Sequence, residues 1–367
     1  MTTTATSRPR LRDLGIVPGM LPPGPLNAIT DVPGVRVGHA TVIHDDGPAR
    51  TGVTAIHPHE GSVFRSQAPA AMAVLNGAGE MTGRAQIDEY GLLETPILIT
   101  NTLSVGIAHA ACIAWLAARE PALGSTDFVI PVVGETYDGY LNDITGQHVR
   151  VEHVLAALTH ASGGPVAEGN VGGGTGMRLF GFKGGIGTAS RVATLDNRTF
   201  TVGVLVQGNY GHREDLLVDG VPVGRELSGA DPADGERDGS VIVAIATDAP
   251  LTDRQLGRLC RRGMLGLGRS GSVARHLSGD ILIAFSNARE NRVERGDTAL
   301  LRSVTHINDD RIDPLFVATV EATEEAVLNA LVAAETMSGR EGRVVAAISH
   351  ERLVEVMRRH GRLRHGS

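Results

Sequence analysis

Short apolar runs recur along the chain, and several of them are continuous rather than alternating. They lie at residues 71–75, 96–100, 128–133, 198–206, 240–246 and 280–286. A strand that is buried on both faces has this pattern, whereas a strand with one wet face alternates apolar and polar residues. The pattern therefore predicts several strands inside a layered body.

Apolar residues at helical spacing fall between these runs, at residues 105–119, 148–161, 252–263, 321–336 and 349–360. The third stretch begins with Thr252 and has Gln255 three residues later, which is the spacing of a capping box. Strands and helices thus mix along all 367 residues, with no internal repeat. We expect a single α/β domain over residues 1–367, a size that large α/β folds reach.

Two polar segments stand apart from this pattern. Residues 1–25 are rich in Thr and Pro, and we expect them to form an extension along the surface. Residues 212–239 are rich in Asp and Gly, and they predict a hairpin followed by an exposed loop that runs straight into Ser240. Such a loop is open to chain cleavage.

Composition narrows the class of protein. The net charge of −7 and the aromatic content of 3% argue against a nucleic-acid partner, which favours basic and stacking surfaces. Two cysteines, Cys112 and Cys260, do not make a disulfide framework and favour a reducing compartment. The N-terminus lacks an apolar signal-peptide core, and no apolar run approaches the roughly 20 residues of a membrane span. We therefore expect a soluble, cytoplasmic protein.

Two motifs could suggest a bound cofactor, and neither has the required context. GNVGGGTGM (169–177) lacks the Gly-Lys-Ser/Thr of a phosphate loop, and it does not follow an apolar strand directly. HPHE (57–60) offers two histidines, but no matching cluster of ligands follows at a recognisable spacing. We expect the first to be a closely packed glycine turn and the second to hold structural or surface histidines.

Ser240 stands where the polar loop ends and an apolar run begins. Asp238-Gly239-Ser240 is a common turn sequence on its own. However, Gly239 has no side chain to block attack on its carbonyl, and it tolerates strained backbone angles. Cleavage after Gly239 would expose a serine α-amine with an ordinary pKa of ~7.7–8.0, which suits a base near neutral pH. The sequence allows both interpretations, a turn serine and a nucleophile.

A second polar pair opens the next apolar run. Ser278 and Asp280 are two residues apart, so on a strand they share one face. A hydroxyl backed by a carboxylate can orient a nucleophile or relay its proton. The alternative is that Ser278 only satisfies a backbone group at the start of the strand.

Two further clusters follow predicted strands, at the place where α/β enzymes often carry function. GETYDGYLND (134–143) places Glu135 and Tyr137 after the run 128–133. QGNYGHRED (207–215) brings Asn209, whose amide can donate to an oxyanion. Each cluster alone fits turn chemistry, whereas four clusters at strand ends together indicate a site.

At these positions the chain resembles the L-aminopeptidase/D-amidase-esterase family typified by DmpA, which includes the β-peptidyl aminopeptidases. The resemblance spans the chain from about residue 11 to the last helix and rests on five segments in the family's order. These are NAITDVPGVRVGHATV (27–42), VVGETYDGYLNDI (132–144), GNVGGGTG (169–176), DGSVIVAIATDAPL (238–251) and SGDILIAFSNA (278–288). It implies a four-layer α/β/β/α sandwich, related to N-terminal-nucleophile hydrolases, and tetramers of αβ units.

The resemblance also implies that the chain cleaves itself between Gly239 and Ser240. The products would be an α chain, 1–239, and a β chain, 240–367, with Ser240 as the N-terminal nucleophile. Ser278 and Asp280 match the family's supporting pair, in which some relatives carry Glu at the second position.

The remaining family residues map to the other two clusters. Asn209 and Tyr137 match groups on the oxyanion side, and Tyr140 could take the role of Tyr137 instead. Glu135 matches a residue that holds the free ammonium of the substrate. No metal or organic cofactor is implied.

We therefore expect a serine aminopeptidase or amidase that acts on short peptides, amides or esters. One alternative is an acyltransferase of similar fold, in which the nucleophile is Thr rather than Ser. Another is a catalytically silent α/β binding scaffold, which would keep an intact chain. The sequence leaves open the preference for α- or β-amino acids and for L or D configuration.

Overall fold

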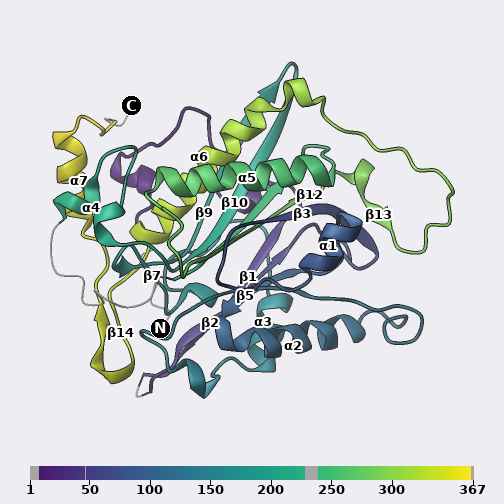
Figure 1. The fold of residues 1–367 in the computed structure, drawn as a ribbon, viewed down its shortest axis with the longest axis horizontal. Coiled ribbons are helices and arrows are strands. Elements are labelled where there is room, and N and C mark those ends of the chain that lie inside the picture. Colours follow the sequence, from purple (N-terminus) through teal and green to yellow (C-terminus); the bar gives the residue numbers. More distant parts are fainter. Residues whose placement is uncertain (1–7, 46, 228–238, 365–367) are drawn as a thin grey trace.

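Two β-sheets lie face to face at the centre of the molecule, and helices cover the outer face of each (Figure 1). The structure is a computed structural model, and it describes residues 8–45, 47–227 and 239–364. From one side to the other the layers are helices, the larger sheet, the smaller sheet and helices. This arrangement is the predicted four-layer α/β/β/α sandwich.

The larger sheet has the strand order β13-β3-β12-β11-β10-β9, and β4 pairs with β3 at one side. Only β11 and β12 run parallel, and the other neighbours in this sheet are antiparallel. The strands are β3 (Ser66–Gly77), β4 (Leu92–Leu93), β9 (Gly185–Leu195), β10 (Arg198–Gly208), β11 (Val241–Thr247), β12 (Gly279–Ser286) and β13 (Val293–Glu294).

The smaller sheet has the order β1-β2-β5-β6, and its last two strands run parallel. They are β1 (Arg36–Ile43), β2 (Arg50–His57), β5 (Ile97–Asn101) and β6 (Val132–Thr136). Two short hairpins lie outside both sheets. They pair β7 (Arg178–Leu179) with β8 (Phe182–Lys183), and β14 (Met337–Ser338) with β15 (Val344–Val345).

Helices α2 (Val105–Ala117) and α3 (Val151–Thr159) cover the smaller sheet, and α5 (Asp253–Arg269) and α6 (Asp313–Val332) cover the larger one (Figure 1). The remaining helices are α1 (Arg84–Tyr90), α4 (Val223–Glu226) and α7 (His350–Arg359). None of the helices in the described ranges combines the length and the apolar character that a membrane span requires. The Thr252–Gln255 capping box at the start of α5 is present, as predicted.

The continuous apolar run of β11 has a simple cause, because both of its faces are buried. Val241 and Val243 pack into the core under α5 and α6, whereas Ile242 and Ala244 pack into the core between the two sheets. Side chains alternate along a strand, so Ser240 continues the face that looks toward the smaller sheet. The cavity described in the next section lies on this face.

Several predicted boundaries were wrong. The run 128–133 forms a strand only from Val132, so Glu135 lies on β6 rather than after it. Helix α6 begins at Asp313, eight residues before the predicted start, and ends at Val332. Residues 321–332 are all buried, whereas the missed first turns carry the exposed Asp313 and Val317 and begin with a proline at their N-terminal end.

Residues 8–25 are mostly at least partly exposed, as predicted, but parts of the segment are anchored in the core, which the prediction did not include. Leu11 and Ile16 are fully buried in the core of α5 and α6. Arg12 forms an ion pair with the buried Glu325 of α6 at 2.7 Å. The apolar and charged contacts therefore hold this segment against the body of the fold.

The segment 212–239 also differs from its prediction where it is described. Val218 and Val221 form only an isolated bridge, and the short helix α4 follows. Residues 228–238, which include Asp238 and most of the predicted loop, lie outside the described residues.

The glycine-rich motif is a packed turn, as predicted. A Cβ on Gly173 would lie 2.1 Å from Gln207 Oε1, and one on Gly174 would lie 2.4 Å from the backbone nitrogen of Ile186. Neither contact leaves room for a side chain. The motif thus brings the backbone into close contact with β9 and β10.

The histidines of the HPHE motif and the two cysteines lie at different places in the fold. His57 and His59 bond through Nε2 to the backbone oxygens of Leu158 and Ser66. Across the described ranges, no three His, Cys, Asp or Glu side chains are grouped to hold a metal ion. Cys112 and Cys260 are free and lie in different cores, and burial raises the pKa of each thiol to about 12.

Candidate active site

Strand ends from both sheets meet at one edge of the sandwich. In the larger sheet, antiparallel pairing places the end of β10 beside the start of β11, with Gly208 opposite Val241. It likewise places the end of β3 beside the start of β12, with Gly77 opposite Gly279. The residues just beyond these strands, including Asn209 and Ser240, are therefore brought together by register.

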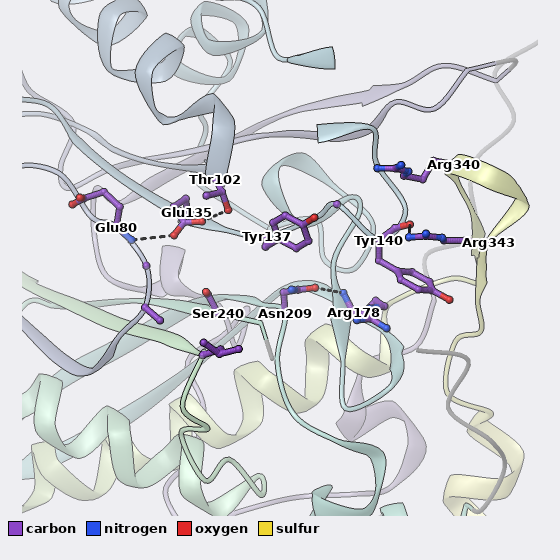
Figure 2. Close-up of a pocket in the computed structure, with 14 residues that line it drawn as sticks. Glu80, Thr102, Glu135, Tyr137, Tyr140, Arg178, Asn209, Ser240, Arg340 and Arg343 are labelled. Carbon is purple, nitrogen blue, oxygen red and sulfur yellow. Dashed lines mark hydrogen bonds between the residues drawn. The ribbon is translucent and has the colours of Figure 1, made fainter. Parts of the chain in front are cut away.

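These residues line a cavity of about 900 Å³, which is within the range of small-molecule and short-peptide sites. Figure 2 shows its charged and polar side chains facing one space. The lining residues are Ala78, Gly79, Glu80, Thr102, Glu135, Tyr137, Gly139, Tyr140, Arg178, Asn209, Ser240, Leu277, Arg340 and Arg343.

Ser240 is held firmly by backbone contacts. Its carbonyl accepts a hydrogen bond from Asn209 N at 2.9 Å, and its Oγ accepts one from Gly279 N at 3.2 Å. Only 5% of the residue is exposed. The hydroxyl is thus presented to the cavity from a rigid strand end, as a nucleophile should be.

Asn209 offers its amide to the neighbourhood of the Gly239–Ser240 bond. Its Oδ1 accepts a hydrogen bond from Arg178 N at 2.7 Å, which leaves the two N–H groups of Nδ2 as the donors on the other side. A Cβ on Gly239 would lie 1.6 Å from the Asn209 carbonyl oxygen and 2.3 Å from Nδ2. Only glycine therefore fits at position 239 in this conformation.

Ser278 and Asp280 form the predicted pair, because Ser278 Oγ donates to Asp280 Oδ1 at 2.6 Å. They lie near Ser240, since the parallel register places its neighbour Val241 next to Asp280. However, Asp280 shares a strand face with Leu282, which packs under α5 and α6, so the pair faces the helix layer. The hydroxyl of Ser240 faces the opposite side of the sheet.

The pair borders a separate, small space on the helix side. Ser278 lines it together with Tyr210 and Arg275. Burial raises the pKa of the Tyr210 hydroxyl, and the charge of Asp280 raises it further. What the pair shares with Ser240 is therefore the backbone of β11 and β12, not the cavity.

Glu135 is a buried carboxylate at the cavity wall, 3% exposed. Its Oε1 accepts a hydrogen bond from Glu80 N at 3.0 Å, and its Oε2 accepts one from Thr102 Oγ1. Burial raises the pKa of this carboxyl above its ordinary value, although the two hydrogen bonds act in the opposite direction. A bound cation would stabilise the ionised form of this buried carboxyl group.

Gly79 shows how close the carboxylate and the hydroxyl are. A Cβ on this residue would lie 3.0 Å from Glu135 Oε1 and 3.7 Å from Ser240 Oγ. The two groups belong to different sheets, yet they face one point. A small group bound there can contact both.

The two tyrosines of the cavity differ in setting. Tyr137 is 49% exposed and folds back over Gly139. Tyr140 is buried, and the guanidinium carbon of Arg178 lies 4.2 Å from the centre of its ring. Both line the cavity, so either can contribute on the oxyanion side.

Sequence reasoning missed several lining residues. Thr102 comes directly after β5 and Glu80 three residues after the end of β3, so the rule that polar residues at strand ends indicate function could have found them. Arg340 and Arg343 lie between two-residue strands near the C-terminus, where no pattern in the sequence indicates a site.

Comparison with known proteins agrees with this geometry. The model of peptidase family S58 matches residues 27–345. The chain belongs to peptidase family S58. It is therefore a hydrolase, and the resemblance noted from the sequence is confirmed.

The relatives cover almost the whole of this chain. It is 46% identical over 377 aligned positions to the β-peptidyl aminopeptidase BapA of Sphingosinicella microcystinivorans, covering 97% of this chain and 93% of the relative. A β-aminopeptidase structure from Burkholderia sp. is 50% identical with a TM-score of 0.89, covering 96% of this chain and 99% of that one.

A third similar protein is the L-aminopeptidase D-Ala-esterase/amidase from Ochrobactrum anthropi, described as a prototype of the serine aminopeptidases and a variant of the Ntn hydrolase fold. It is 46% identical with a TM-score of 0.92, and the match covers 97% of this chain and all of that one. The four-layer fold predicted for this chain is thus shared with a solved hydrolase.

Proposed function

We propose that the protein is a self-processing serine aminopeptidase and amidase with Ser240 as its nucleophile. The observation that carries this proposal is the point shared by Glu135 Oε1 and Ser240 Oγ beside Gly79. A free ammonium held by Glu135 places the carbonyl of the first residue close to the serine hydroxyl. The requirement for an N-terminal amine follows from this proximity.

The nucleophile is activated by cleavage of the Gly239–Ser240 bond. The freed α-amine of Ser240 has an ordinary pKa near ~7.7–8.0, so it can accept the proton of Oγ near neutral pH. Gly239 supports this step, because its Cα approaches the Asn209 carbonyl oxygen and amide too closely for any side chain. The products are chains of residues 1–239 and 240–367.

The catalytic cycle uses groups already in place. Ser240 Oγ attacks the scissile carbonyl, and Asn209 Nδ2, with Tyr137 or Tyr140, stabilises the oxyanion. The amine returns the proton to the leaving group, and water then releases the acyl group. In each half of the cycle the Ser240 amine takes a proton from the attacking group and gives it to the departing group, while one bond to the carbonyl carbon forms and another breaks.

Ser278 and Asp280 act from the other face of the sheet. They do not share the face of Ser240 Oγ, but their strand lies beside β11, so we infer that they act on the backbone nitrogen of Ser240, which becomes the α-amine after cleavage. We assign them the role of positioning that amine through a hydroxyl backed by a carboxylate.

The relatives indicate the substrate class. Two are named for β-amino acid substrates and one for L-amino acid and D-Ala substrates. We propose short peptides, amides or esters with a free amine as substrates, and tetramers of αβ units as the assembly. An acyltransferase would pass the acyl group to an added amine rather than to water.

The test is a panel of aminoacyl p-nitroanilides with α or β and L or D residues, each also N-acetylated, run beside a denaturing gel and intact-mass analysis. We expect two chains, hydrolysis of free-amine substrates only, and a single inactive chain for Ser240→Ala. A wild-type chain that stays whole, or equal turnover of acetylated substrates, contradicts the proposal.

A further inference from the structure

The single lysine of the chain has no part in the chemistry described above. Lys183 is the only lysine among the 34 Lys and Arg residues of the sequence, and its side chain is fully buried. It lies on β8 of the short hairpin, where the register places it opposite Arg178 of β7. Lysines almost never lie fully buried without partners, so the contacts of this one have to explain its position.

Backbone carbonyl groups surround the amine of Lys183. Its Nζ donates to the backbone oxygens of Gly184 at 2.7 Å, Met177 at 2.8 Å and Gly174 at 3.4 Å. Two of these residues belong to the glycine-rich motif, GNVGGGTGM (169–177). The packed turn of this motif therefore folds around the ammonium group of a lysine, and not around a phosphate.

The number of acceptors favours the charged form of Lys183. Burial lowers the pKa of this amine to about 7, and the charge of Asp138, which is also fully buried, acts in the opposite direction. An ammonium has three N–H donors, one more than a neutral amine, and three carbonyl oxygens lie around Nζ. The ammonium thus satisfies all three oxygens with charge-assisted hydrogen bonds.

One of these carbonyl groups belongs to the peptide unit that holds Asn209. The oxygen of Met177 accepts from Lys183 Nζ, and the N–H of the same peptide group, which is that of Arg178, donates to Asn209 Oδ1 at 2.7 Å. Figure 2 shows this second bond between Asn209 and Arg178. A peptide group is planar, so a bond that holds its C=O also fixes the direction of its N–H. Lys183 and Asn209 are therefore connected through a single peptide group.

This connection acts on the N–H groups that Asn209 offers to an oxyanion. Because Oδ1 is bonded to the Arg178 N–H, the amide has to present Nδ2 on its other side. A cation at the carbonyl oxygen draws electron density from the peptide nitrogen, which makes its N–H a stronger donor. Hydrogen bonds in a chain strengthen one another, so the same polarisation passes through the Asn209 amide to Nδ2.

We propose that Lys183 is a positioning residue for oxyanion stabilisation, which orients the Asn209 amide and strengthens its N–H donors through the Met177–Arg178 peptide group. The inference rests on the proposed function, since it takes Asn209 as a donor to the oxyanion. Lys183 does not line the cavity, so it acts on the reaction only through Asn209. Its effect should appear in the transition state, where the oxyanion carries its charge.

The experiment is a double-mutant cycle on the p-nitroanilide that wild type hydrolyses fastest. Lys183→Met removes the N–H donors and keeps an unbranched side chain, and Asn209→Ala removes the donor to the oxyanion. We would measure kcat and KM for wild type, both single variants and the double variant, on protein already split into two chains. If a variant splits too slowly, the rate of self-cleavage is compared across the four proteins, because Gly239 lies against the same Asn209 amide.

We expect Lys183→Met to lower kcat by about tenfold to hundredfold with little change in KM, because an interaction made only in the transition state is weakened. Asn209→Ala should lower kcat by about 10²–10³-fold. The double variant should lose no more than Asn209→Ala alone, since the effect of Lys183 passes through Asn209. Lys183→Gln keeps N–H donors and should lose less than Lys183→Met.

Asn170→Ala is the matched control for a loosened glycine-rich motif. Asn170 connects the start of the motif to the backbone of Glu335, donating from Nδ2 to its oxygen at 2.8 Å and accepting at Oδ1 from its nitrogen at 3.1 Å. The change leaves the Met177–Arg178 peptide group untouched, so kcat and KM should stay as in wild type. Thermal unfolding of every variant measures the effect on stability, and Lys183→Gln replaces Lys183→Met in the cycle if the latter does not fold.

The outcomes separate this inference from the proposed function. A kcat close to wild type in Lys183→Met overturns the inference and leaves the aminopeptidase standing. A loss that appears in KM instead of kcat, or that has the same size in the Asn209→Ala background, also overturns it, because Lys183 would then not act through Asn209. A full kcat in Asn209→Ala overturns the oxyanion role of Asn209 together with the inference. No hydrolysis of any free-amine substrate by split wild type overturns the proposed function itself.

Discussion

The two sheets contribute different parts of the same cavity. The larger sheet holds Ser240 and Asn209 at neighbouring strand ends, joined by a backbone hydrogen bond of 2.9 Å. The smaller sheet holds Glu135 beside Thr102, where the parallel strands β5 and β6 end together. In the proposed function, bond cleavage therefore depends on one sheet, and recognition of the substrate amine depends on the other.

This division has a consequence for self-cleavage. The Gly239–Ser240 bond lies just before β11 of the larger sheet. It is an internal peptide bond, so it offers no ammonium for Glu135 to bind. Changes in the larger sheet should therefore affect both processing and turnover, whereas changes in the smaller sheet should affect turnover alone. The predictions below use this difference.

The largest expected effect in the larger sheet, apart from loss of Ser240 itself, comes from the Ser278–Asp280 pair. Ser278→Ala and Asp280→Asn should each lower kcat by ~10²–10⁴-fold, because the amine of Ser240 loses its orienting partner. The double variant should lose little more than either single one, since the two act as a unit. Steady-state kinetics on the fraction already split into two chains measures this.

Restricting the measurement to split protein matters, because a processing defect would otherwise look like a catalytic one. If either variant keeps a kcat close to wild type, that residue has no part in turnover, and the amine of Ser240 acts without it.

The smaller sheet is tested by Glu135→Gln. The variant should lose roughly tenfold to hundredfold in kcat/KM for free-amine p-nitroanilides, the value of a charge-assisted hydrogen bond of ~1.5–3 kcal/mol. Gel analysis should show normal cleavage into two chains. Glu152→Gln, on the exposed face of α3, is the matched control. Failure of Glu135→Gln to cleave itself would show that the two sheets do not divide their tasks in this way.

How much of this could be read from the sequence differs from strand to strand. The strands β10, β11 and β12 are rich in apolar residues, and they were predicted nearly in full. The strands β1 and β2 of the smaller sheet and β9 of the larger one are rich in Gly and Thr, and all three were missed. Small polar residues pack between layers here, so burial leaves no apolar signature.

The site residues show the same limit of local sequence patterns. Ser240, Asn209 and Glu135 were proposed from strand ends and from a family resemblance, and their proximity depends on strand order that no local pattern contains. The face of Ser278 and Asp280 relative to Ser240 required the parallel register of β11 and β12. Their catalytic roles stay predictions.

The pH dependence of turnover should distinguish the sheets as well. Burial raises the pKa of Glu135, and this group must be ionised to bind an ammonium, so kcat/KM should fall as the pH drops through that raised pKa. The loss of activity due to Glu135 should therefore occur above the ordinary Glu pKa of ~4.3. The Ser240 amine must be unprotonated to act as a base, so kcat/KM should also decrease as the pH drops through the ordinary α-amine pKa of ~7.7–8.0. A pH–rate profile of wild type and Glu135→Gln checks this. An acid limb that is unchanged in Glu135→Gln would belong to another group.

The smallest expected effect is at the point where the two sheets approach each other. In Gly79→Ala the new Cβ would lie 3.0 Å from Glu135 Oε1, 3.1 Å from Gly279 Cα and 3.7 Å from Ser240 Oγ. The methyl group would narrow the space between the amine-binding carboxylate and the nucleophile without removing either. We expect kcat/KM for free-amine substrates to fall roughly three- to tenfold, equivalent to about 1 kcal/mol, mainly through KM.

Gly106→Ala is the matched control for this change, because a Cβ at that position of α2 has no neighbour within 4 Å. Full kcat and KM determinations on both variants, with a gel to confirm processing, decide the outcome. If Gly79→Ala turned over free-amine substrates as fast as wild type and with the same KM, the substrate amine would not pass between Glu135 and Ser240. The amine would then have to bind elsewhere in the cavity, and the smaller sheet would lose its assigned role in recognition.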